Sequence, residues 1–189
     1  MASLAGWLKT PWRRAERRRL DPYWDYFINT PPADRANSML DVIRKAPEGN
    51  VFPTKADLHS PEVTATHVKE MARYLGADLV GIARLERDDA GHPFAIVCAV
   101  CADHDPREAL GIGGQVPVQN GLFVTFVLSA WIRELGYRAS ATTSLDGARL
   151  AAAAKLGTLD RAGRLVTAEY GTRVHVADVI RTDLPLTAA

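Results

Sequence analysis

The sequence predicts an α+β fold in which a mostly antiparallel sheet is flanked by helices. The expected elements follow the order helix, two strands, helix, strand, helix, two strands. Strands that come in adjacent pairs favour antiparallel pairing over the strand–helix alternation of a parallel sheet. With 189 residues, 47% of them hydrophobic, the chain is long enough to bury one core.

The first 50 residues differ in composition from the rest. They are rich in arginine, aromatic residues and proline, and the stretch WRRAERRRL (12–20) has five arginines beside one glutamate. Only short helices are expected here, at residues 5–20 and 33–45. We predict an N-terminal arm over residues 1–50 and a folded domain over residues 51–189. The arm could pack on its own domain or a sister domain, or dock on an acidic protein, anionic lipid or RNA. Its aromatic residues also point to a homo-oligomer.

The domain begins with a helix and two strands. Ser60 suits the N-cap of a helix over residues 60–76, Pro61 its first position and Gly76 its end, with apolar residues recurring on one face. The apolar runs 78–85 and 94–101 have the length of strands. The stretch ERDDAGHP between them favours a turn, so the two runs predict a β-hairpin.

The second half of the domain is expected to contain a buried central helix. A glycine-rich loop over residues 110–121 precedes LFVTFVLSAWIRELG (122–136), which is apolar almost all round until Arg133. A short strand (137–143) and an alanine-rich helix (145–157) follow. Residues 163–186 then read as a second hairpin, hinged at Tyr170 and Gly171.

Composition limits the function classes. The chain has 23 basic and 22 acidic residues, so its charge of +1 gives no reason to expect a nucleic acid as the main ligand. No apolar run approaches the roughly 20 residues that span a bilayer, and no signal-peptide pattern follows the early arginines, so a cytoplasmic protein is expected. An iron–sulfur cluster usually takes four cysteine thiolates. The sequence has two, and we expect no cluster on this chain alone.

Two local groups could carry chemistry. Cys98 and Cys101 have the spacing of a redox or metal pair, but they lie within one strand and should face opposite sides of it. We expect structural thiols and no metal site, because no second pair completes a zinc site. Asp103, His104 and Asp105 follow the strand end, where a solvated loop is the simple expectation. His104 is the best candidate for a catalytic titratable group.

Four blocks resemble, in order, the corrinoid-binding catalytic domain shared by reductive dehalogenases and epoxyqueuosine reductase. They are KEMARYLGADLVGIARL, WIRELGYRAS, AKLGTLDRAGRLVTAEYGTRV and VIRTDLPL, and they span residues 62–186, about two thirds of the chain. The last two are the most specific, since the family has a glycine-marked loop, a segment like LLITPEYGPRV and a strand closing on TDLPL. The resemblance implies a nitroreductase-like α+β fold.

The resemblance also implies that this loop and hairpin line one side of a cobalamin, held with its nucleotide tail detached from cobalt. A corrin ring is broad, flat and apolar on its faces, with amides at its rim. Glycines would allow close backbone approach, and polar and apolar side chains would complete the wall. The expected cofactor-binding residues are Gly157, Thr158, Leu159, Gly163, Arg164, Leu165, Val166, Tyr170 and Gly171. The alternative is that these residues form only a helix cap, a turn and core.

The sequence departs from the family in three ways. In full-length members the TDLPL strand leads into a ferredoxin-like module with cysteine-rich motifs, whereas TAA follows here. Lys155, Asp160 and Ala168 replace the middle residue of a GLG motif, a glycine and a proline. Gln119 and Asn120 stand where epoxyqueuosine reductases carry an acidic motif, so the family's proton donor is not expected.

Together these observations predict a cobalamin-binding protein related to reductive dehalogenases, without iron–sulfur clusters. It would carry or process the corrinoid, or act as one subunit of a split reductase with an external electron donor. A non-catalytic interaction protein with a filled cofactor groove, engaging a partner through its arm, is an alternative from another class. A flavin-binding nitroreductase-like reductase follows from the fold alone.

Overall fold

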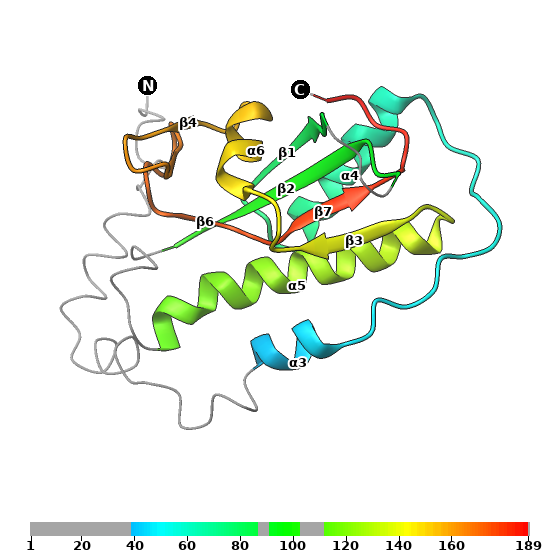
Figure 1. Ribbon diagram of the computed structural model, residues 1–189, viewed down its shortest axis with the longest axis horizontal. Helices are drawn as coiled ribbons and strands as arrows, with labels where there is room; N and C mark the ends of the chain where they lie inside the picture. Colours follow the sequence, from blue (N-terminus) through cyan, green and yellow to red (C-terminus); the bar gives the residue numbers. More distant parts are fainter. Residues whose placement is uncertain (1–38, 87–90, 103–111, 189) are drawn as a thin grey trace, which may run out of the picture.

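A computed structural model describes residues 39–86, 91–102 and 112–188. They form a five-stranded antiparallel sheet with helices on both faces, beside a two-stranded sheet (Figure 1). The predicted α+β class is thereby confirmed. The elements are α3 (Met39–Lys45), α4 (Pro61–Tyr74), β1 (Leu79–Arg84), β2 (Phe94–Cys101), α5 (Ile112–Glu134), β3 (Ala139–Thr142), α6 (Gly147–Ala153), β4 (Thr158–Leu159), β5 (Leu165–Val166), β6 (Val174–Val176) and β7 (Val179–Thr182).

Strand β2 is the centre of the large sheet, whose strand order is β1-β2-β7-β3. One edge of β2, from Phe94 to Ala99, pairs with the whole of β1, which confirms the predicted first hairpin. The other edge has two partners in succession, since Phe94 to Ile96 pair with β7 and Ala99 to Cys101 pair with β6. Ala177 N donates to Cys98 O at 2.9 Å between the two partners. Asp178 therefore lies at the junction of β6 and β7.

The two faces of the sheet carry separate apolar cores. Alternation along β2 sends Ile96 and Cys98 toward α4 and α5, and Ala95 and Val97 toward α6 and Leu165. In Figure 1, α5 lies on one side of the sheet and α6 on the other, with α3 outside α5. Both cysteines are free thiols, and burial raises the pKa of Cys98 to about 12. Cys98 is thus a core residue and a poor nucleophile at neutral pH.

Helix α4 forms where its end signals predicted it. The Ser60 hydroxyl accepts a hydrogen bond from Val63 N, Pro61 is the first helical residue, and Gly76 follows the helix with a φ of +111°. No helix among the described residues is both long enough and apolar enough to cross a bilayer.

Helix α5 begins earlier than expected. Residues 112–121, predicted as part of a glycine-rich loop, are helical. The missing Cβ of Gly121 explains why the helix can continue along the sheet, since a Cβ there would lie 2.9 Å from Ala177 Cβ. Pro117 is buried within the helix despite its missing N–H donor. Packing against a distant strand has overridden the local preference of glycine and proline for a loop.

The prediction of a second hairpin over residues 163–186 is wrong. Strand β5 pairs back with β4, whereas β6 and β7 both pair with β2. What remains at the expected hinge is a closed turn, in which Thr167 and Gly171 exchange two backbone hydrogen bonds of 2.9 Å. The free edge of β2 satisfies the backbone groups of β6 and β7, and β7 buries Val179 and Ile180 there.

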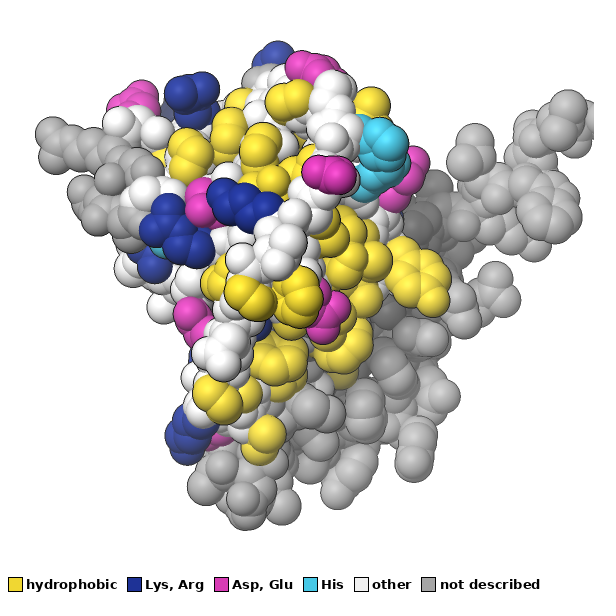
Figure 2. Space-filling model, turned by 90° about the vertical axis from the view of Figure 1, so that its right-hand side faces the viewer, with side chains coloured by type: hydrophobic (Ala, Val, Ile, Leu, Met, Phe, Trp, Pro, Cys, Tyr) yellow, Lys and Arg dark blue, Asp and Glu magenta, His cyan; other side chains and the backbone are white. Residues whose placement is uncertain are grey.

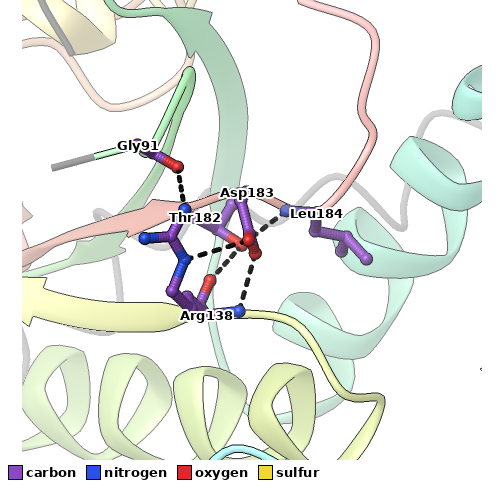
Figure 3. A network of polar contacts seen from close by, with 5 residues as sticks. All are labelled: Gly91, Arg138, Thr182, Asp183 and Leu184. Carbon is purple, nitrogen blue, oxygen red and sulfur yellow. Dashed lines mark hydrogen bonds and ion pairs between the residues drawn. The ribbon is translucent and has the colours of Figure 1, made fainter. Parts of the chain in front are cut away.

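The TDLPL stretch is explained by contacts within the fold (Figure 3). The Asp183 carboxylate accepts hydrogen bonds from Arg138 N at 2.6 Å and Arg138 Nε at 3.0 Å. Arg138 also donates to Gly91 O at 2.7 Å. The Thr182 hydroxyl donates to Arg138 O at 2.7 Å and accepts from Leu184 N at 3.0 Å. These contacts fix the start of β3 to the end of β7 and to the segment that enters β2.

Candidate functional site

The segment that carries the resemblance forms a short hairpin followed by a turn. Thr158 pairs with Val166 and Leu159 with Leu165. The intervening turn is organised by Asp160, whose carboxylate accepts from the backbone N–H groups of Ala162 and Arg164 and from Arg164 Nε. These hydrogen bonds, Arg164's first, lower the pKa of Asp160. The acidic residue that replaces a family glycine therefore stabilises this loop.

Gly157 is required by the protein's own packing. A Cβ at this position would lie 2.3 Å from Val166 O, so β5 can approach only a glycine. The residue with left-handed backbone after α6 is Lys155, with a φ of 60°. Gly157 therefore neither ends the helix nor offers open space to a cofactor.

Gly163 and Gly171 differ from Gly157. Both have positive φ, +75° and +58°, and no atom lies within 4 Å of where a Cβ would be. Backbone at these two positions is therefore open to an incoming group. The left-handed conformation also favours glycine there, whatever the ligand.

The predicted side chains divide by accessibility. Thr158, Leu159 and Arg164 are exposed, Leu159 to 38%, whereas Val166 is half-buried. Leu165 is 5% exposed and belongs to the core beneath α6. The hairpin thus offers an open surface of polar and apolar side chains, to which Leu165 does not contribute.

Tyr170 connects this loop to the end of β2. Burial raises the pKa of its phenol to about 12, with further contributions from a hydrogen bond to Glu169 and from the nearby charge of Asp78. The Asp78 carboxylate accepts from Cys101 N at 2.6 Å. Tyr170 is therefore a neutral hydroxyl at physiological pH. His104, the predicted catalytic group, lies outside the described residues.

A second site was missed by sequence reasoning. A cavity of about 330 Å³ lies between α3, α5 and β3, and a smaller one of about 230 Å³ lies at the start of α6. None of the predicted cofactor-binding residues lines either cavity. Asp178 lines both, and His175 lies nearby with its ring 3.3 Å from the Cβ position of Gly121. Apolar and polar residues alternate in the stretch TRVHVADV. This alternation could have indicated that the His175 side chain points to the face of β6 opposite its apolar neighbours.

His175 should make stability depend on pH. Burial lowers its pKa, Arg44 lowers it further and Asp178 opposes both. As the pH falls, His175 therefore binds a proton more readily in the unfolded chain than in the folded protein. The free energy of unfolding should then fall as pH drops below about 6.5. His175→Gln should flatten the dependence between pH 7.5 and 5.5 in urea titrations. His67→Gln, at an exposed position on α4, is the matched surface control. Equal slopes for His175→Gln and wild type would contradict this assignment.

No protein-family model and no curated protein matches the chain. Solved structures do. A reductive dehalogenase whose structure is described as suggesting a mechanism for B12-dependent dehalogenation superposes with a TM-score of 0.68 and 24% identity, over 79% of this chain and 26% of that chain. A variant of the catabolic reductive dehalogenase NpRdhA superposes with a TM-score of 0.66 and 29% identity, over 79% and 23% of the two chains.

Epoxyqueuosine reductase bound to a tRNA stem loop also matches, with a TM-score of 0.48 and 12% identity, over 67% of this chain and 47% of that chain. The dehalogenase matches confirm the predicted similarity to the catalytic part of reductive dehalogenases. The chain spans about a quarter of the length of the dehalogenases.

Proposed function

We propose that this protein binds cobalamin through residues 157–171 in a nitroreductase-like fold. It carries or processes the corrinoid, or acts as one subunit of a split reductase that receives electrons from a partner. One observation supports this above others. The loop that contains the family motifs is open to solvent in a fold that matches NpRdhA at 29% identity.

The residues of the loop fit one wall of a corrinoid site. Leu159 and Val166 offer apolar contact, and Thr158 and Arg164 can donate to rim amides. The neutral hydroxyl of Tyr170 donates to Glu169, and its oxygen can accept from a rim amide N–H. Gly163 and Gly171 leave the backbone accessible. A bound cobalamin would supply a redox-active cobalt, and this chain would bind the rim and exclude water from one side. Neither described cavity shares a residue with this loop.

His104 remains the proposed titratable group near the cofactor. Cys101 contributes to the raised pKa of Tyr170, so the chain leaves β2 close to the proposed corrinoid wall. The segment with His104 begins two residues further on. Electrons for any reduction would come through a separate donor.

Titration of the purified protein with cobalamin, under reducing and non-reducing conditions, tests the proposal. We expect a saturable shift of the visible spectrum toward the form with a detached nucleotide tail, and co-elution in gel filtration. Tyr170→Ala should weaken binding at least tenfold because it removes both a hydrogen-bond acceptor for the rim amides and half-buried apolar surface. Tyr74→Ala, which removes a tyrosine that is 87% exposed on α4, should leave binding unchanged. A spectrum of free cobalamin and complete separation on the column would refute the proposal.

A second candidate, a non-catalytic interaction protein, is favoured by a different surface. The face on the right of Figure 1 exposes apolar side chains between charged ones (Figure 2). Phe52, in the linker between α3 and α4, is 57% exposed. If this surface joins two copies, light scattering should show a concentration-dependent dimer that Phe52→Ser abolishes. A monomer at every concentration would exclude self-association.

A further inference from the structure

The cavity between α3, α5 and β3 has the dimensions of a small-molecule site. Its volume is about 330 Å³, at the lower end of the range for ligand pockets. It shares no residue with the proposed corrinoid wall. An inference about it is therefore independent of cobalamin binding.

Arg133 gives this cavity a buried positive charge. The residue is 6% exposed and lines the cavity from α5. One of its terminal nitrogens donates to Ala139 O at 2.9 Å, and its other N–H groups have no hydrogen-bond partner among the described residues. Burial lowers the pKa of Arg133, and the more distant charge of Glu48 only partly offsets this. A buried guanidinium without a direct counter-charge destabilises the protein unless an acceptor binds to it.

The other charged groups of the cavity have partners. Arg44 pairs with Asp178 at 3.7 Å across the wall. The Glu48 carboxylate accepts a hydrogen bond from the Ser140 hydroxyl. Among the residues that the structure describes, no carboxylate forms an ion pair with Arg133. Arg133 is thus the charged group of this cavity that is best placed to take an external acceptor.

The remaining lining defines the rest of the ligand. The hydroxyls of Thr125 and Ser129 donate to carbonyls of their own helix, which leaves them as acceptors or weak contacts toward the cavity. Ile43, Leu122 and Phe126 add apolar surface. An apolar body with one anionic end matches this distribution. The planar guanidinium also matches the geometry of a carboxylate, which it can bind through two parallel hydrogen bonds.

We propose that this cavity binds a small amphipathic carboxylate, whose carboxylate pairs with Arg133 and whose apolar body packs against Ile43, Leu122 and Phe126. The occupant is defined by one charge and a compact apolar group.

Calorimetric titration of the full chain, without cobalamin, tests this proposal with paired probes. Benzoate and hexanoate supply the carboxylate, and benzamide and hexanamide are their neutral counterparts. We expect saturable binding of at least one carboxylate, at least tenfold tighter than its amide. Arg133→Gln should reduce that affinity at least tenfold, whereas Arg149→Gln, an exposed arginine on α6, should not change it.

A second variant guards against misfolding of Arg133→Gln, which also loses the contact to Ala139. Ala46→Phe introduces a ring into the cavity from the end of α3 without touching the guanidinium contact. It should abolish carboxylate binding while the circular dichroism spectrum stays that of wild type. Three results would each overturn the proposal: no saturable binding of either carboxylate, equal affinities for acid and amide, or undiminished affinity in Ala46→Phe.

Discussion

Replacing Gly157 with alanine is expected to separate β5 from β4, and so to remove the proposed cobalamin binding together with part of the protein's stability. The added Cβ would lie 2.3 Å from Val166 O and 3.0 Å from Val166 C, and backbone atoms cannot rotate away as a flexible side chain can. Overpacking of this kind costs about 1–3 kcal/mol. In a chain of this size that corresponds to a melting temperature lower by about 3–10 °C. Displacement of Leu165, a core residue on β5, should add to the loss.

Thermal unfolding and the cobalamin titration measure the two effects in the same preparation. Gly163→Ala is the matched control for the unfolding measurement, because a Cβ there meets no atom within 4 Å and only the left-handed backbone, with a φ of +75°, is strained. Its expected cost is about 1 kcal/mol, with the β4–β5 pairing intact. If Gly157→Ala melts and binds cobalamin as wild type does, the close approach of β5 is not a constraint on this loop.

Asp183→Ala should be as damaging, although the residue lines neither cavity and does not belong to the proposed corrinoid wall. It removes the acceptor for two hydrogen bonds from Arg138, at 2.6 and 3.0 Å, and leaves a backbone N–H at the start of β3 without that partner. Hydrogen bonds to a charged group contribute about 1.5–3 kcal/mol, and partial exposure of Arg138 reduces the ion-pair share. We expect a loss of about 2–3 kcal/mol in urea-induced unfolding.

Asp183→Asn separates the two contributions. The amide oxygen can still accept from Arg138 N, so this variant should lose about half as much stability as Asp183→Ala. Equal losses in the two variants would assign the effect to the charge alone. Wild-type stability in Asp183→Ala would show that the Thr182 and Gly91 contacts of Figure 3 are sufficient.

Local signals predicted the parts of the fold that form from neighbouring residues. Helix α4 carries its own cap at Ser60 and its own end at Gly76, and β1 and β2 are consecutive strands that pair with each other. The early start of α5 could not be predicted, because it depends on Gly121 meeting Ala177. The second hairpin failed for a similar reason, since β6 and β7 pair with β2 rather than with the strand before them.

The two candidate sites also differ in how far the sequence could predict them. Residues 157–171 could be selected from the sequence because they resemble a motif of the reductive dehalogenase family, but their individual roles required coordinates. Gly157 makes room for β5, and Leu165 lies in the core. The cavity around Arg133 has no motif, since it arises where α3, α5 and β3 meet. Only the burial of one arginine at the end of an apolar helix distinguishes it.

The place of β7 in the sheet has a consequence for biosynthesis. This strand is the last of the described strands to be translated, yet it lies between β2 and β3, and β3 pairs with no other described strand. While the ribosome is still extending the chain, the β1–β2 hairpin therefore has an open edge and β3 has no neighbour. Nascent chains that stop before Val179 should expose Ile96 and the apolar side of α5, and they should aggregate or engage chaperones. Completion of the sheet depends on four residues, Val179–Thr182, that leave the ribosome after all the other described strands.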